Sequence, residues 1–133
     1  MNLPHLAGLY HSQRIDHLWV CHIDSALAAL LTGTRNRVLM SHETMRKQHR
    51  RHGELLLEHY EVLPMAIMLG EYWREAENAA IVVYVDAVRF NTTFRAYLKG
   101  TPEGMFVTSF NMMRDRHARK QRRKPLPLIR EHL

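Results

Sequence analysis

The chain has little of what a disulfide-stabilised, exported or membrane protein needs. Its 133 residues include one cysteine, Cys21, which cannot form an internal disulfide and is typical of a reducing compartment. No apolar run approaches the ~18 residues of a membrane helix. The N-terminal segment lacks a basic start followed by a sustained apolar stretch, so it is not typical of a signal peptide. We expect a cytoplasmic protein that forms a single domain over residues 1–133 and has no membrane partner.

The common motifs of nucleotide, acyl-transfer and metal chemistry are also missing. There is no glycine-rich phosphate loop and no nucleophile elbow. Residues 42–46 begin like the zinc motif H-E-x-x-H, but Arg46 stands at the position of the second histidine. His49 and His52 could supply two metal ligands, yet no cysteine pair or acidic cluster completes a set. We therefore expect neither a metal nor a cofactor.

What the chain does have is positive charge, gathered in two places. The net charge is +6, from 19 Lys and Arg against 13 Asp and Glu. One basic cluster lies within residues 35–52 and the other within 114–124. Either cluster alone could be an ordinary solvated helix face, but two clusters that flank one fold favour a polyanionic partner. Nucleic acid is the expected partner.

The spacing of apolar residues predicts helices in the first half and strands in the second. The expected helices cover 5–16, 25–33, 42–52 and 54–69, with Pro64 kinking or breaking the last; the expected strands cover 37–41, 79–88, 91–99 and 105–110; a basic helix is expected over 112–123. This order indicates an α+β fold, with N-terminal helices packed on a small antiparallel β-sheet of about four strands and a basic C-terminal helix. The domain divides into a helical part (1–35), a core (36–114) and a basic tail (115–133).

Two groups of side chains are candidates for chemistry. On a helix, His49 and His52 would share the face of Met45. On a strand, Arg95, Tyr97 and Lys99 would share the face opposite to an apolar one. Histidine can transfer protons near neutral pH, and cationic side chains bind phosphate oxygens. The alternative for each group is a solvated surface, and the sequence does not decide whether Thr108 or Ser109 shares the face of Tyr97.

Short motifs follow one another in a fixed order over residues 36–114. They are Val38–Ser41, Lys47, His52-Gly53-Glu54, Tyr60, Leu63-Pro64, Gly70, Tyr97-Leu98-Lys99 and Thr108-Ser109-Phe110. The ordered set resembles the phage-associated nucleases of the barnase, EndoU, colicin and RelE group, including domains attached to Mu-like phage head proteins. Gly53 departs from the family pattern, which has proline after the histidine, and this departure weakens a turn signature without touching the chemistry.

The resemblance implies a metal-independent endoribonuclease of phage, prophage or toxin type. In this reaction a general base removes the proton of a ribose 2′-OH, the oxygen attacks phosphorus, and a general acid protonates the leaving 5′-oxygen to give a 2′,3′-cyclic phosphate. We predict His52 as acid or base, Lys47, Arg95 and Lys99 as phosphate ligands, and Thr108 or Ser109 as a supporting hydrogen-bond donor. The predicted nucleic-acid-binding residues are His49, Arg50, Arg51, Tyr97, Arg114, Arg119, Arg122 and Arg123.

The expected partners are RNA, with tRNA among the candidates, and an acidic inhibitor or antitoxin protein that would cover residues 35–52 and 95–99. Two other functions are compatible with the same residues. One is a non-catalytic nucleic-acid-binding protein that keeps the fold and the basic surface. The other is a structural or inhibitory phage protein whose charge serves a protein partner.

Overall fold

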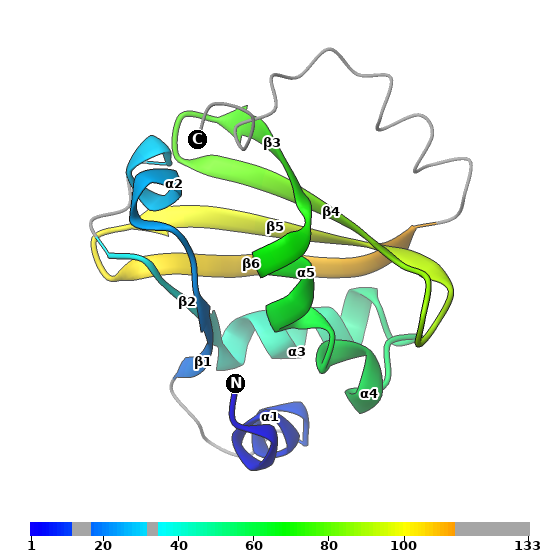
Figure 1. Cartoon of the computed structure of the whole chain (residues 1–133). Helices are drawn as coiled ribbons and strands as arrows, with labels where there is room; N and C mark the ends of the chain where they lie inside the picture. The colour runs from blue at the N-terminus through cyan, green and yellow to red at the C-terminus, as the bar shows by residue number, and fades with distance from the viewer. Residues whose placement is uncertain (12–16, 32–34, 114–133) are drawn as a thin grey trace.

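The computed structural model describes residues 1–11, 17–31 and 35–113, which form an α+β fold (Figure 1). The helices are α1 (Leu3–Tyr10), α2 (Ser25–Leu30), α3 (His42–Arg51), α4 (Leu57–Tyr60) and α5 (Leu63–Leu69). The strands are β1 (His17–His22), β2 (Arg37–Ser41), β3 (Glu71–Ala76), β4 (Ala79–Asp86), β5 (Thr92–Thr101) and β6 (Gly104–Met113). The predicted α+β class is confirmed.

The sheet has six strands in the order β1-β2-β6-β5-β4-β3, so the prediction of about four strands is wrong. The sheet is also mixed, because β2 and β6 are parallel while every other neighbouring pair is antiparallel. The two strands that sequence patterns missed, β1 and β3, lie at the two edges of the sheet. Edge strands carry polar and aromatic side chains on their exposed side, so their apolar pattern is weak.

The predicted helices are present with changed bounds: the helix expected over 5–16 is α1, Leu3–Tyr10, and residues 12–16 lie outside the described part of the chain. The helix predicted over 42–52 is α3, and Ser41 caps it, since its side-chain oxygen accepts a hydrogen bond from the backbone N–H of Thr44 at 3.1 Å. The helix expected over 54–69 is two helices, α4 and α5, and Pro64 lies in the first turn of α5. Proline is tolerated there because the first backbone N–H groups of a helix have no intrahelical partner.

The basic helix expected over 112–123 is wrong at its start, because Met112 and Met113 end β6. Residues 114–123 lie outside the described part of the chain. Within the described residues, every helix is too short or too polar to cross a membrane.

The five helices of the described residues all contribute buried side chains to one apolar core, which they form with the strands; α5 lies across one face of the sheet (Figure 1). The rings of Phe94 and Phe110 stack at the centre of this core, with centroids 5.2 Å apart, and Tyr60 packs against Phe110 at 5.7 Å. A second, smaller cluster of Trp73, Ile81 and Val83 contains no helix residue. We call the sheet face that carries this second cluster the outer face.

The turn between β4 and β5 is organised by Asp86. Its carboxylate is buried and accepts backbone N–H groups from Val88 at 3.2 Å, Arg89 at 3.1 Å and Phe90 at 2.9 Å. Burial opposes ionisation of the carboxyl, but the three hydrogen bonds and the charge of Arg89 outweigh it, so the pKa of Asp86 lies below its ordinary value. The folded protein therefore stabilises the charged form of Asp86 more than the unfolded chain does.

We expect Asp86→Asn to lower the free energy of unfolding at pH 7 by about 1–3 kcal/mol, because the amide keeps only one acceptor oxygen. A depressed folded-state pKa gives stability that is present above the ordinary pKa of ~3.9 and lost as the pH falls below it. Urea unfolding of both proteins across this range measures the effect. The difference between them should shrink in acid, and a difference that stays constant down to pH ~2.5 would contradict this role of Asp86.

Candidate functional site

The polar side chains of β5 lie on the outer face, as the alternation predicted. Phe94, Ala96 and Leu98 point into the core, so Arg95, Tyr97 and Lys99 point the opposite way. The guanidinium carbon of Arg95 lies 5.1 Å from the centroid of the Tyr97 ring, within cation–π range. One half of the predicted site, Arg95 with Tyr97, is therefore in direct contact.

This pair combines a fixed cation with a protonated hydroxyl. Desolvation raises the pKa of Tyr97 and the charge of Glu75 adds to the rise, while Arg95 partly opposes it. The phenol therefore stays protonated at neutral pH and can donate a hydrogen bond. The Nε atom of Arg95 is buried and has no hydrogen-bond partner among the described residues. Native proteins rarely leave a buried donor unused, so this guanidinium is a candidate ligand group.

Ser109, on β6, is the hydroxyl residue that shares the face of Tyr97. The two residues are cross-strand partners, and partners in an antiparallel pair point to the same side. Thr108 is the extra residue where the register shifts, and its hydroxyl donates to the backbone oxygen of Tyr97 at 3.4 Å. The register thus brings Ser109 to the predicted β5 residues, a choice that the sequence had left open.

Asn111 belongs to the same group, and the sequence analysis missed it. It is the cross-strand partner of Arg95 and is buried, with 7% of its surface exposed. No local motif marks this asparagine. The pairing of β5 with β6 is the signal that identifies it, since residues directly opposite Arg95 and Tyr97 must share their face.

Lys47 lies on α3 and contacts β6 near Ser109. Its helix lies beside the edge of β6 beyond the point where the pairing with β2 ends. The pairing between β2 and β6 covers Met105 and Phe106, and beyond it the Lys47 ammonium donates to the carbonyl of Thr108. Burial lowers the pKa of Lys47, and the nearby charge of Arg51 lowers it further. The predicted residues Lys47, Thr108 and Ser109 are therefore brought together at one edge of β6.

Gln48 completes this edge, and it too was missed. Its amide nitrogen donates to the carbonyl of Phe110, and its oxygen accepts the Phe110 N–H at 3.2 Å. The side-chain amide thus bonds the edge of β6 as a neighbouring strand would. The sequence places Gln48 three residues after Met45 on one helix face, but only the structure shows that the glutamine is fully buried and that its amide therefore needs a buried partner.

The two predicted histidines, His49 and His52, contact other parts of the chain. The ring of His49 faces α1, with Nε2 2.7 Å from the backbone oxygen of Tyr10 and its ring 4.7 Å from the Tyr10 ring. His52 follows the last residue of α3, and its Nδ1 lies 3.6 Å from a carboxylate oxygen of Glu54. Among the described residues, no hydrogen bond, ion pair or ring contact joins either histidine to Arg95, Tyr97 or Ser109.

The remaining predicted residues are placed as follows. Arg50 and Arg51 are exposed in the last turn of α3, where positive charge also stabilises the helix dipole. Lys99 is exposed on the outer face, two residues beyond Tyr97. The predicted contacts of the tail lie outside the described residues: Arg114, Arg119, Arg122 and Arg123.

Metal binding and cysteine chemistry have less support among the described residues. Among the described residues, no group of three His, Cys, Asp or Glu side chains could hold a metal ion. Cys21 is buried, and burial raises the pKa of its thiol to about 11, so it is a poor nucleophile at neutral pH. A cleft of about 450 Å³ beside α1 and α4 is separate from the outer face; it is lined by Tyr10, His11, Leu56, Leu57, Glu58, Glu61 and Arg89.

No family model, curated protein or solved structure matches the chain. The chemistry of the site is therefore inferred from its geometry. That geometry joins an arginine, a tyrosine and a serine on the outer face to a lysine at the adjacent edge of β6. Such a group can hold an anion, donate hydrogen bonds and stack on a planar ring.

Proposed function

We propose that the protein is a metal-independent endoribonuclease whose site lies on the outer face of the sheet beside β6. The observation that carries the proposal is the contact of Arg95 with Tyr97, directly opposite Ser109 and next to the edge where Lys47 is held. A bidentate guanidinium suits a phosphodiester, and a tyrosine suits a nucleobase or a developing negative charge. The resemblance adds a phage, prophage or toxin-type role, with an acidic inhibitor protein as the restraining partner.

The proposed reaction uses four side chains. Lys47 acts as the neutral amine, which its lowered pKa favours; it accepts the proton of the ribose 2′-OH as that oxygen bonds to phosphorus, and becomes the ammonium. Tyr97, which stays protonated, gives a proton to the leaving 5′-oxygen as its bond to phosphorus breaks. Arg95 stabilises the extra negative charge of the pentacoordinate state, and Ser109 donates a supporting hydrogen bond. Lys99 binds the next phosphate along the strand.

Lys47 takes the role that the sequence gave to His52. The reason is position: the ammonium of Lys47 bonds the carbonyl of Thr108, whereas the ring of His52 lies beside Glu54 past the end of α3. A proton-transfer group must come within hydrogen-bond reach of the substrate oxygen, and this geometric requirement comes first. His52 is assigned to the surface that approaches RNA, together with Arg50 and Arg51.

A non-catalytic RNA-binding protein is the second candidate, and one specific observation favours it. Lys47 and Gln48 both bond the backbone of β6, so Lys47 has a structural role that needs no reaction. In that case Arg95, Tyr97 and Lys99 would still bind RNA, and the ammonium would serve only to complete the edge of the sheet. Cleavage assays separate the two candidates.

We expect the purified protein to cleave total RNA and tRNA equally well with and without EDTA, because every proposed catalytic group is a side chain. The products should carry 2′,3′-cyclic phosphate ends, detected by their resistance to phosphatase until acid opens the ring. RNA in which the 2′-OH is methylated is the matched control and should stay intact. Activity that EDTA abolishes and a divalent metal restores would contradict the mechanism, and binding without cleavage would favour the second candidate.

A further inference from the structure

A second row of side chains crosses the outer face next to the proposed site. Trp19 on β1 pairs with Leu39 on β2, Leu39 pairs with Phe106 on β6, and Phe106 pairs with Lys99 on β5. Lys99 and Tyr97 are two residues apart on one strand, so this row lies roughly 7 Å from the row of Tyr97. An RNA strand bound at Tyr97 could continue directly onto this row.

The outer end of the row is an exposed aromatic surface. Trp19 has 43% of its surface exposed and is the only aromatic residue among the large hydrophobic side chains exposed in the described residues. Its ring lies 5.4 Å from that of His22, and the ring of His17 meets Phe106 at 5.1 Å. The cross-strand neighbours of Leu39, Trp19 and Phe106, thus each contact a histidine ring; Leu39 is buried, while Trp19 stays partly open to solvent.

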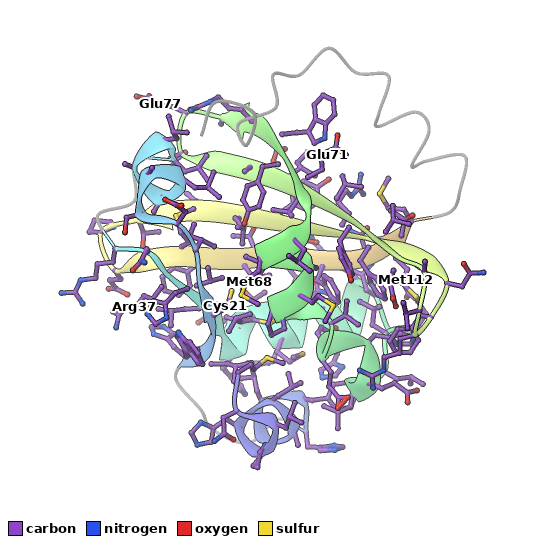
Figure 2. The ribbon with its side chains drawn as sticks, viewed as in Figure 1. Cys21, Arg37, Met68, Glu71, Glu77 and Met112 are labelled. Carbon is purple, nitrogen blue, oxygen red and sulfur yellow. The ribbon has the colours of Figure 1, made fainter. Side chains whose placement is uncertain are left out.

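Charge is distributed unevenly from one edge of the sheet to the other. Figure 2 shows Glu71 and Glu77 toward the β3 edge of the molecule, whereas Arg37 lies on β2, near the other edge. The guanidinium of Arg37 is held in place because its Nε donates to the backbone oxygen of Glu103 at 2.7 Å. Arg37 and Lys99 thus border the aromatic row with positive charge, which suits a polyanion better than an apolar protein surface.

We propose that Trp19 is a base-stacking subsite for single-stranded RNA, one that lies beyond the cleavage site on the same sheet face. The inference rests on the proposed function for its ligand class, and it adds the direction in which the strand leaves the site. Bases stack on aromatic side chains regardless of sequence, while cations next to the rings contact the backbone phosphates. In this arrangement an unpaired base covers Trp19. Lys99 lies three strand spacings away, roughly 14 Å, and contacts a phosphate of the strand between that base and the cleavage site.

The two tryptophans make this subsite directly measurable. Trp73 is buried in the second cluster, with 8% of its surface exposed, so a Trp73→Phe variant reports on Trp19 alone. A short 2′-O-methyl oligoadenylate, which the proposed mechanism cannot cleave, should quench the Trp19 fluorescence and shift it as the ring stacks. The same strand in a duplex should not, because its bases are already stacked.

The affinity for the single-stranded probe should fall about 10-fold or more in Trp19→Ala, and much less in Trp19→Phe, which keeps a stacking ring. Met65→Ala is the matched control, since Met65 is at least as exposed as Trp19 but lies on α5, on the other side of the sheet. An unchanged Trp19 emission on titration, or equal affinities for all the variants, would overturn the subsite. A Trp19 emission that depends on protein concentration in the absence of RNA would also overturn it, in favour of a second copy of the chain.

The outcomes for the subsite and for the proposed function are separate. Quenching of Trp19 by the probe in a protein that never cleaves RNA would support the subsite and contradict the nuclease assignment. EDTA-resistant cleavage of a long RNA that Trp19→Ala leaves unchanged in KM and kcat would do the reverse. With both correct, Trp19→Ala should raise KM for long RNA and leave the cleavage of a dinucleotide unchanged.

Discussion

Replacing Arg95 by methionine is expected to slow RNA cleavage by about 10²-fold or more, which is the usual cost of removing one group that stabilises transition-state charge. The physical reason is that the guanidinium is a fixed positive charge on the outer face, in contact with the Tyr97 ring at 5.1 Å. Most of the loss should appear in kcat. Single-turnover cleavage of a labelled oligonucleotide measures the chemical step without product release.

The controls for this variant test charge, fold and the rival proton-transfer group. Arg46→Met removes the same charge from an exposed position on α3 and should leave the rate nearly unchanged. The melting temperature of Arg95→Met should stay close to that of the wild type, because the Nε atom of Arg95 loses no hydrogen bond among the described residues. His52→Ala should have a smaller effect on kcat than Arg95→Met. A rate for Arg95→Met within about 3-fold of wild type would contradict the site, and a larger loss in His52→Ala would restore His52 as acid or base.

Replacing Gln48 by alanine is expected to lower the free energy of unfolding by about 3–5 kcal/mol. Gln48 is fully buried, and its amide bonds both the carbonyl and the N–H of Phe110. Truncation leaves these two backbone groups buried without partners and opens a cavity beside the phenol oxygen of Tyr60, 3.5 Å from the amide nitrogen. Urea unfolding followed by circular dichroism gives the free-energy difference directly.

Ser109→Ala is the matched control, since it removes only the 3.5 Å contact of the Ser109 hydroxyl with the Gln48 oxygen. We expect it to cost less than about 1 kcal/mol. Gln48→Glu keeps the size of the side chain but replaces the donor with a carboxylate facing the Phe110 carbonyl. It should be strongly destabilised at pH 7 and recover partly at pH 4, where the carboxyl is protonated. A loss below about 1 kcal/mol for Gln48→Ala would mean that the edge of β6 does not depend on this amide.

The sequence by itself determined the elements with a strong local signal. The helix predicted over 42–52 is present as α3, His42–Arg51, and Ser41 caps it through its own side chain. Strict alternation along β5 placed Arg95, Tyr97 and Lys99 on one face, because successive side chains of any strand point to opposite sides. These outcomes depend on neighbours within a few positions in the chain, so no knowledge of the fold was needed.

Tertiary structure alone decided which distant residues meet. The choice between Thr108 and Ser109 followed from a register shift between β5 and β6, which no local pattern records. The roles of Gln48 and His49 followed from the elements that α3 contacts: β6 on one side and α1 on the other. A histidine in a basic run and a glutamine on a helix look the same in sequence whether they face solvent, a neighbouring helix or a strand edge.

The edges of the sheet show the same limit. Strands β1 and β3 carry weak patterns, so the sequence predicted about four strands where the structure has six. With β1 unrecognised, Trp19 had no place in the sequence-based site; only the pairing of β1 with β2 puts it in a row with Phe106 and Lys99. Composition and local periodicity determined the chemistry that this chain carries and the class of its fold. Strand pairing decided where that chemistry gathers, because hydrogen bonds between strands join residues that are far apart in the chain.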